Sequence, residues 1–178
     1  MEFPALKQLD QSSDSGLMWQ QLTRQANQHY MLQDLGKAWV HYEKAMAEAS
    51  DLLGHFQETG LPLSVPAAFV VSCHNLADLL FRQKENEKAH LFLHRACVEL
   101  IRLAGLPGLP LRARLACVEQ LQPAVVALME RVNPSLSVQQ ETQELVIRAR
   151  TAALSVYQIA GYAVQTRLED APTTGRPS

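Results

Sequence analysis

Two histidines carry the first candidate for chemistry. His90 and His94 are four residues apart on one predicted helix, so their imidazoles share a face and could supply half of a metal site. His74 or Asp78, on a neighbouring predicted helix, could complete it. Two imidazoles alone do not hold a metal, and such histidines are commonly solvated or locally hydrogen-bonded. We therefore assign no metal-binding residue and expect no cofactor.

Other reactive groups lack the spacing that catalysis needs. The sequence has no Gly-x4-Gly-Lys, Gly-x-Gly-x2-Gly, Gly-x-Ser-x-Gly, His-Glu-x2-His or Cys-x2-Cys motif. Its three cysteines, Cys73, Cys97 and Cys117, are odd in number, far apart and set in apolar helical segments. This pattern favours reduced, packed thiols over disulfides. We assign no catalytic residue and expect that the protein is not an enzyme.

Composition limits the partner classes. The chain has 178 residues, of which 47% are apolar and 19% charged, and a formal net charge of -2. One domain with a substantial core is expected, without a field that attracts nucleic acid or anionic lipid. Residues 1–16 lack the basic and apolar regions of a secretory signal, and no apolar run approaches the roughly 20 residues of a membrane span. A cytoplasmic protein without nucleic-acid or membrane partners is predicted.

The apolar residues recur at helical spacing, which predicts an all-α fold. We expect a flexible segment at 1–16, one helical domain at 17–169 and a disordered tail at 170–178. Pro123 removes a backbone donor and should break or kink the fifth helix, while Ser137 with Gln140 forms a capping box for the last helix. The predicted helices are residues 17–32, 35–56, 67–83, 85–103, 111–122 continuing to 132, and 137 onward.

Four of the six predicted helices have an apolar stripe that should face the core. These stripes combine large residues with alanines that permit close helix packing. They comprise Met18, Leu22, Ala26 and Tyr30; Ala38, Tyr42, Ala45, Ala49 and Leu52; Ala89, Leu93, Ala96 and Leu100; and Leu145, Ala149, Ala152, Val156 and Ala160.

Residues 23–45 and 74–96 align without a gap and form two copies of one helical hairpin. Ala26 and Ala77 take the small position of the first helix. Ala38, Tyr42 and Ala45 in one copy match Ala89, Leu93 and Ala96 in the other. This pattern resembles the tetratricopeptide repeat family. The resemblance implies antiparallel hairpins stacked as a short superhelix, with C-terminal capping helices.

The chain departs from the family pattern in several places. Leu22 and Cys73 replace its tryptophan, and His29 and Leu80 replace its tyrosine. Ala38 and Ala89 are 51 residues apart, against a family period of about 34. A lengthened second helix and loop resemble kinesin-light-chain-type repeats. The C-terminal third is either a third, degenerate repeat or only a cap.

The resemblance also implies a concave groove that binds another protein or a peptide. Asn27 and Asn75 match asparagines that hold a peptide backbone or a terminal carboxylate in some relatives, but Thr23 stands where the carboxylate-binding relatives have lysine. Tyr30 and Phe81 could instead pack between adjacent hairpins. The groove positions carried over are Gln20, Thr23, Asn27, Tyr30, Met31, Val71, His74, Asp78, Phe81 and Arg82.

Three functional hypotheses follow from the sequence. The first is a protein- or peptide-binding adaptor or chaperone that uses this groove. The second is a homo-oligomeric structural protein, such as a homodimer, joined through the last helix or the open end of the array. The third is a metal-binding sensor or enzyme based on the histidines.

Overall fold

The structure is a computed structural model that describes residues 14–131 and 136–169. The predicted tail at 170–178 and residues 1–13 of the predicted flexible N-terminus lie outside the described residues. The described residues form six helices and no strand, which confirms the all-α prediction. The helices are α1 (Asp14–Met31), α2 (Leu35–Thr59), α3 (Val65–Arg82), α4 (Asn86–Ala104), α5 (Leu111–Glu130) and α6 (Leu136–Glu169).

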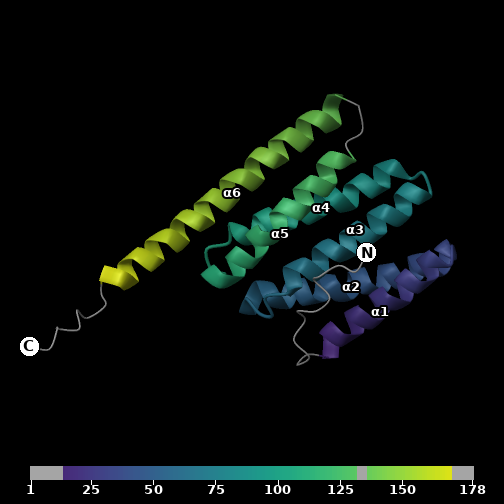
Figure 1. The fold of residues 1–178 in the computed structure, drawn as a ribbon, viewed down its shortest axis with the longest axis horizontal. Coiled ribbons are helices and arrows are strands. Elements are labelled where there is room, and N and C mark those ends of the chain that lie inside the picture. The colour runs from purple at the N-terminus through teal and green to yellow at the C-terminus, as the bar shows by residue number, and fades with distance from the viewer. Residues whose placement is uncertain (1–13, 132–135, 170–178) are drawn as a thin grey trace, which may run out of the picture.

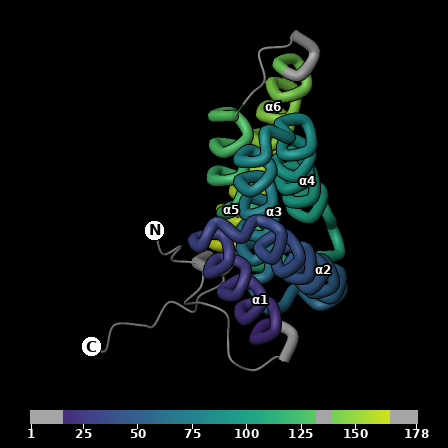
Figure 2. Tube along the Cα trace, turned by 90° about the vertical axis from the view of Figure 1, so that its right-hand side faces the viewer, coloured from purple at the N-terminus to yellow at the C-terminus, as the bar shows by residue number. Residues whose placement is uncertain are grey.

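Consecutive helices pack antiparallel, side by side along the chain (Figure 1). They form three hairpins, α1–α2, α3–α4 and α5–α6. Helix α3 packs mainly on α2 and also touches α1, and α5 packs in the same way on α4 and α3. In the view of Figure 2, α1, α3 and α5 lie toward one side of the stack, whereas α2 and α4 lie toward the other.

The first two hairpins turn in the same way. Gln33 and Lys84 occupy equivalent positions, and both have a left-handed backbone, with φ of 63° and 65°. In each turn the next backbone N–H reaches back to the preceding helix: Asp34 N to His29 O at 3.0 Å, and Glu85 N to Leu80 O at 2.9 Å. The turns therefore close the two helix ends with the same hydrogen bonds. The gapless alignment of the two segments reflects a repeated three-dimensional unit.

Small residues allow the helices within each hairpin to approach closely. Ala26, Ala77 and Ala124 are buried on the first helices of the three hairpins. The second helices share a 4-3-4 spacing of inward-facing residues. In α6 this spacing is carried by Leu145, Ala149 and Val156, which are buried, and by Ala152, which is half-buried. The C-terminal third thus has the hairpin architecture of the first two thirds.

The predicted stripe of the first helix was wrong at one end. Met18 is 48% exposed, and Trp19 is fully buried in its place. The Trp19 Nε1–H donates to Ser72 Oγ at 2.8 Å, and the Ser72 hydroxyl donates to the Ala68 carbonyl at 3.0 Å. The hydrogen bond from α3 satisfies the indole donor inside the core, which favours Trp19 over Met18 for the inner position.

Three predicted boundaries also need correction. Helix α1 starts at Asp14 rather than at residue 17, because the prediction followed apolar residues and the first turn offers few. Helix α5 continues through Pro123, so the predicted break is absent; Pro123 is exposed, while Leu121 and Ala124 are buried. Helix α6 starts at Leu136, so the predicted cap Ser137 falls within its first turn; that side chain lies outside the described residues.

Candidate functional site

Several predicted groove residues gather at the C-terminal ends of α1 and α3. The Arg82 guanidinium lies over the Tyr30 ring, 4.4 Å from its centroid, and Arg82 Nη1 donates to the Tyr30 carbonyl at 3.5 Å. Arg82 belongs to the second hairpin and Tyr30 to the first. The pair therefore joins adjacent hairpins through a cation–π contact.

The next two hairpins are joined in the same way. The Arg131 guanidinium, just after α5, lies 4.8 Å from the centroid of the Phe81 ring, and its Nη2 is 3.5 Å from Asp78 Oδ1. The Phe81 and His90 rings also meet in a T-shaped arrangement. We call Tyr30, Arg82, Phe81, Arg131 and Asp78 the arginine–aromatic row. Tyr30 and Phe81 therefore pack between adjacent hairpins, because an arginine of the following hairpin lies over each ring.

Three other predicted groove residues face the interior rather than an open surface. Thr23 is only 1% exposed, so its placement on an accessible wall was wrong. Asn27 Oδ1 accepts a hydrogen bond of 2.6 Å from the Tyr42 hydroxyl, and burial raises the pKa of Tyr42 well above its usual range. His74 is half-buried, and the lack of solvent around it lowers its pKa, against the opposing charge of Asp78. These groups support packing between α1, α2 and α3.

The remaining predicted groove residues differ in how far they are exposed to solvent. Gln20 is half-buried, Met31 is largely exposed at the end of α1, and Val71 is buried. The structure thus brings several predicted residues together in the arginine–aromatic row, but leaves few of them free to meet a ligand.

The predicted histidine pair, His90 and His94, is partly buried, and the three thiols are fully buried. Within the described residues, no group of three or more histidine, cysteine or acidic side chains is placed to hold a metal ion. Burial lowers the pKa of His90, which packs against Phe81. Cys73, Cys97 and Cys117 are unpaired and buried, and burial raises the pKa of each thiol to about 12. Such thiols are poor nucleophiles at neutral pH.

A more open site lies at the other end of α3, where the chain passes from α2 into α3. Gly60 ends α2 with a left-handed backbone, φ 74°, and its N–H donates to the Phe56 carbonyl at 2.7 Å. A Cβ at Gly60 would stand 3.0 Å from the Pro110 ring, so only glycine lets the turn lie this close to the start of α5. Pro66 occupies the first turn of α3, which it favours.

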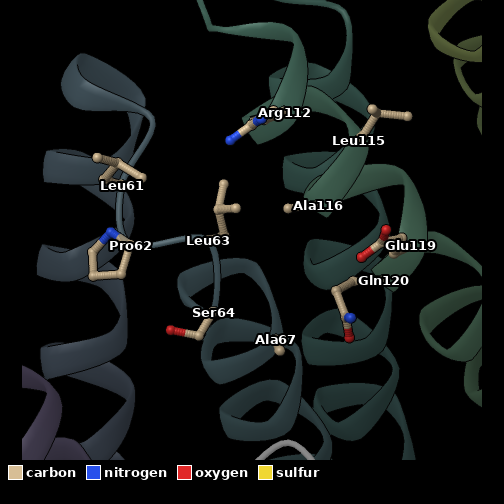
Figure 3. A pocket seen from close by; sticks show the side chains of 10 residues that line it. All are labelled: Leu61, Pro62, Leu63, Ser64, Ala67, Arg112, Leu115, Ala116, Glu119 and Gln120. Carbon is tan, nitrogen blue, oxygen red and sulfur yellow. The ribbon is translucent and has the colours of Figure 1, made fainter. Parts of the chain in front are cut away.

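A cleft of about 650 Å³ separates this turn from α5 (Figure 3). Apolar side chains line much of it; Leu61 is 59% exposed, and Leu63 is also largely exposed. Arg112 extends from α5 toward the turn. We call it the loop cleft, lined by Leu61, Pro62, Leu63, Ser64, Ala67, Arg112, Leu115, Ala116, Glu119 and Gln120.

The charged groups of the loop cleft are available to a ligand. Arg112 and Glu119 are exposed, and neither forms an ion pair with another described residue. The cleft therefore combines an apolar floor with one accessible cation, one accessible anion and the amide of Gln120. This combination can hold an apolar side chain and orient the polar backbone of a peptide beside it.

Sequence reasoning missed the loop cleft. The predicted helices end at residue 56 and resume at residue 67, so residues 57–66 were treated only as a connection, although two leucines occur among its glycine and prolines. Leucines in a short, proline-rich connection are the signal that could have pointed to this site. Its second wall could not be read from the sequence, because Arg112 and Leu115 lie some fifty residues away.

Comparison with known proteins identifies a family but no characterised relative. None of the described helices combines the length and hydropathy that a membrane span requires. No curated protein and no solved structure shows a significant match to the chain. Residues 17–160 match a family described as protein of unknown function (DUF2753), and this range includes all three hairpins apart from the ends of α1 and α6. The chain therefore belongs to the DUF2753 family.

Proposed function

We propose that the protein is a peptide-binding adaptor or chaperone module of tetratricopeptide type, and that the loop cleft receives its ligand. The observation that carries this proposal is the open, largely apolar cleft with an unpaired arginine at its edge. The stacked antiparallel hairpins support the tetratricopeptide assignment. Arrays of this type expose extended binding surfaces, which supports the peptide-binding role.

The residues of the cleft favour a particular kind of peptide. An apolar side chain would enter between Leu63 and Leu115, and a carboxylate next to it would pair with Arg112. Gln120 can hydrogen-bond to the peptide backbone. The ligand is therefore a short segment of another protein with an apolar residue beside an acidic one.

The arginine–aromatic row plays a supporting part in this proposal. It holds the C-terminal ends of α1, α3 and α5 together through contacts of Arg82 with Tyr30 and of Arg131 with Phe81. Its contacts fix the relative positions of the hairpins, and so of the two walls of the loop cleft. A cytoplasmic location belongs to the same proposal and is supported by the three unpaired thiols.

A displayed random peptide library, selected on the immobilised full-length chain, tests this function. We expect enriched peptides to share an apolar residue next to an acidic one. Anisotropy of a labelled consensus peptide should show about a tenfold or greater loss of affinity for Arg112→Glu, because a charge-assisted contact becomes a repulsion.

Lys44→Glu, an equal charge change on the exposed side of α2, is the matched control and should bind like the wild type. Leu63→Ala should weaken binding without unfolding the chain, since this side chain is exposed. Failure to enrich a common sequence, or equal binding by the Arg112 and Lys44 variants, would refute the proposal.

A further inference from the structure

One surface of the third hairpin is open, whereas the equivalent surface of each of the first two hairpins is covered by the hairpin that follows it. Helix α3 packs on α2 and α1, and α5 packs on α4 and α3. Among the described residues no helix takes the equivalent place on α6 and α5. A groove of about 400 Å³ runs between these two helices instead.

This groove, which we call the end groove, is mainly apolar. It is lined on α5 by Val125 and Val126 and on α6 by Val146, Ala153 and Tyr157. Val126 and Tyr157 are about half exposed. On the preceding hairpins, the same position is occupied by helices whose inner side chains are fully buried. The end groove is therefore shaped to receive helices.

Helix α6 also extends this apolar surface beyond α5. It has 34 residues against 20 in α5, so it is about 20 Å longer at 1.5 Å per residue. Figure 1 shows its C-terminal part projecting past the other helices. Residues 151–165 contain no charged side chain, and the exposed Val164 follows Tyr157 on the same face of α6. Exposed apolar surface of this extent is typical of an interface.

The charges at the end groove complement those of a second copy of the chain. Glu119 stands on the α5 wall and Arg150 on the α6 wall; both are exposed, and neither has an ion-pair partner among the described residues. Consider a second copy that faces this groove and is related to the first by a two-fold axis in the plane of contact, midway between Glu119 and Arg150. This axis places the Arg150 of the second copy opposite Glu119 of the first, and its Glu119 opposite Arg150. Each copy would then offer Glu119 to the Arg150 of the other, and both pairs would form at once.

We propose that two copies of the chain associate through their end grooves, with the α5–α6 hairpins face to face and Glu119 of each copy paired with Arg150 of the other. The apolar residues between these pairs supply the buried surface, and the charges fix the register. This inference does not depend on the proposed peptide-binding function, because the loop cleft and the end groove have only Glu119 in common.

Light scattering of the full-length chain over a wide range of concentration tests the proposal. We expect the mass to rise from 19.8 kDa toward twice that value. Glu119→Arg and Arg150→Glu should each shift this rise to much higher concentration, because each places like charges together at two symmetric positions. An equimolar mixture of the two variants should dimerise again, since one variant then has arginine at both positions and the other has glutamate at both.

Two controls separate the interface from other effects of charge. Glu144→Arg makes the same change on α6 outside the end groove, and Arg112→Glu alters the loop cleft; both should dimerise like the wild type. Far-UV dichroism confirms that every variant is folded. A wild-type mass that stays monomeric at all concentrations would assign the groove to a helix of a different protein and overturn the proposal. Dimers that persist in both charge variants, or fail to return in their mixture, would also overturn it.

Discussion

The surfaces of the first and third hairpins have the same architecture, but only the first is covered. Helix α3 lies on the first hairpin, where Cys73 Sγ is 4.0 Å from Met46 Sδ and Ser72 satisfies the Trp19 indole; Phe69 and Val70 of α3 are also buried. The equivalent surface of the third hairpin exposes Val126 and opens into a groove. A repeat array therefore gains its stability at the junctions between hairpins, while its end remains available for association.

Removal of the last helix should have the largest effect on this arrangement. Deletion of residues 137–178 uncovers the surfaces of α4 and α5 that bury Leu145 and Val156. We expect aggregation and loss of helix content, since the exposed surface is large and apolar. Light scattering and far-UV dichroism, at equal concentrations of truncated and full-length chain, measure both effects. A soluble, monomeric and fully helical truncation would show that α6 is not needed to complete the stack.

A matched pair of substitutions compares the covered and open surfaces directly. Val70 in α3 is 3% exposed, whereas Val126 in the end groove is 46% exposed. Val70→Ala should lower the free energy of unfolding by about 2 kcal/mol, through lost burial and an unfilled cavity. Val126→Ala should change it by less than about 0.5 kcal/mol at concentrations where the chain is monomeric. Urea denaturation of both variants provides the comparison, and equal losses would contradict it.

The hydrogen bond between α1 and α3 should have a smaller effect. Ser72→Ala leaves the buried Trp19 N–H without its acceptor and should cost about 1 to 2 kcal/mol in the free energy of unfolding. In a Trp19→Phe background the same change should cost much less, because the donor is gone. A double-mutant cycle by urea denaturation isolates this coupling. No coupling between the two positions would mean that the indole donor does not need Ser72.

The sequence was sufficient to predict the helices and the first two hairpins. The reason is physical: Ala38, Tyr42 and Ala45 repeat in type and spacing at Ala89, Leu93 and Ala96, and this spacing places them all on buried faces. The sequence left open whether the C-terminal third is a third repeat or a cap, because α5 and α6 keep the spacing but change the residue types. Trp19 was missed because its burial depends on an acceptor in α3 that is 53 residues away.

The candidate site was less predictable than the fold. Positions carried over from the repeat family identified residues near one another, but could not show that Arg82 and Arg131 would cover Tyr30 and Phe81. The loop cleft depends on the contact of Gly60 with Pro110, two turns that are distant in sequence. Contacts of this kind arise from the angle between hairpins, which no local pattern encodes.

The three buried thiols can report local opening of the structure. Cys73, Cys97 and Cys117 lie on α3, α4 and α5, and at a pKa of about 12 none reacts until its surroundings open. The order in which a thiol reagent modifies them, followed by mass spectrometry, therefore reports the order in which the surroundings of α3, α4 and α5 open. The rate at which each of the three thiols is modified thus measures local opening on three consecutive helices, and a bound partner would slow the modification of the thiol nearest to it.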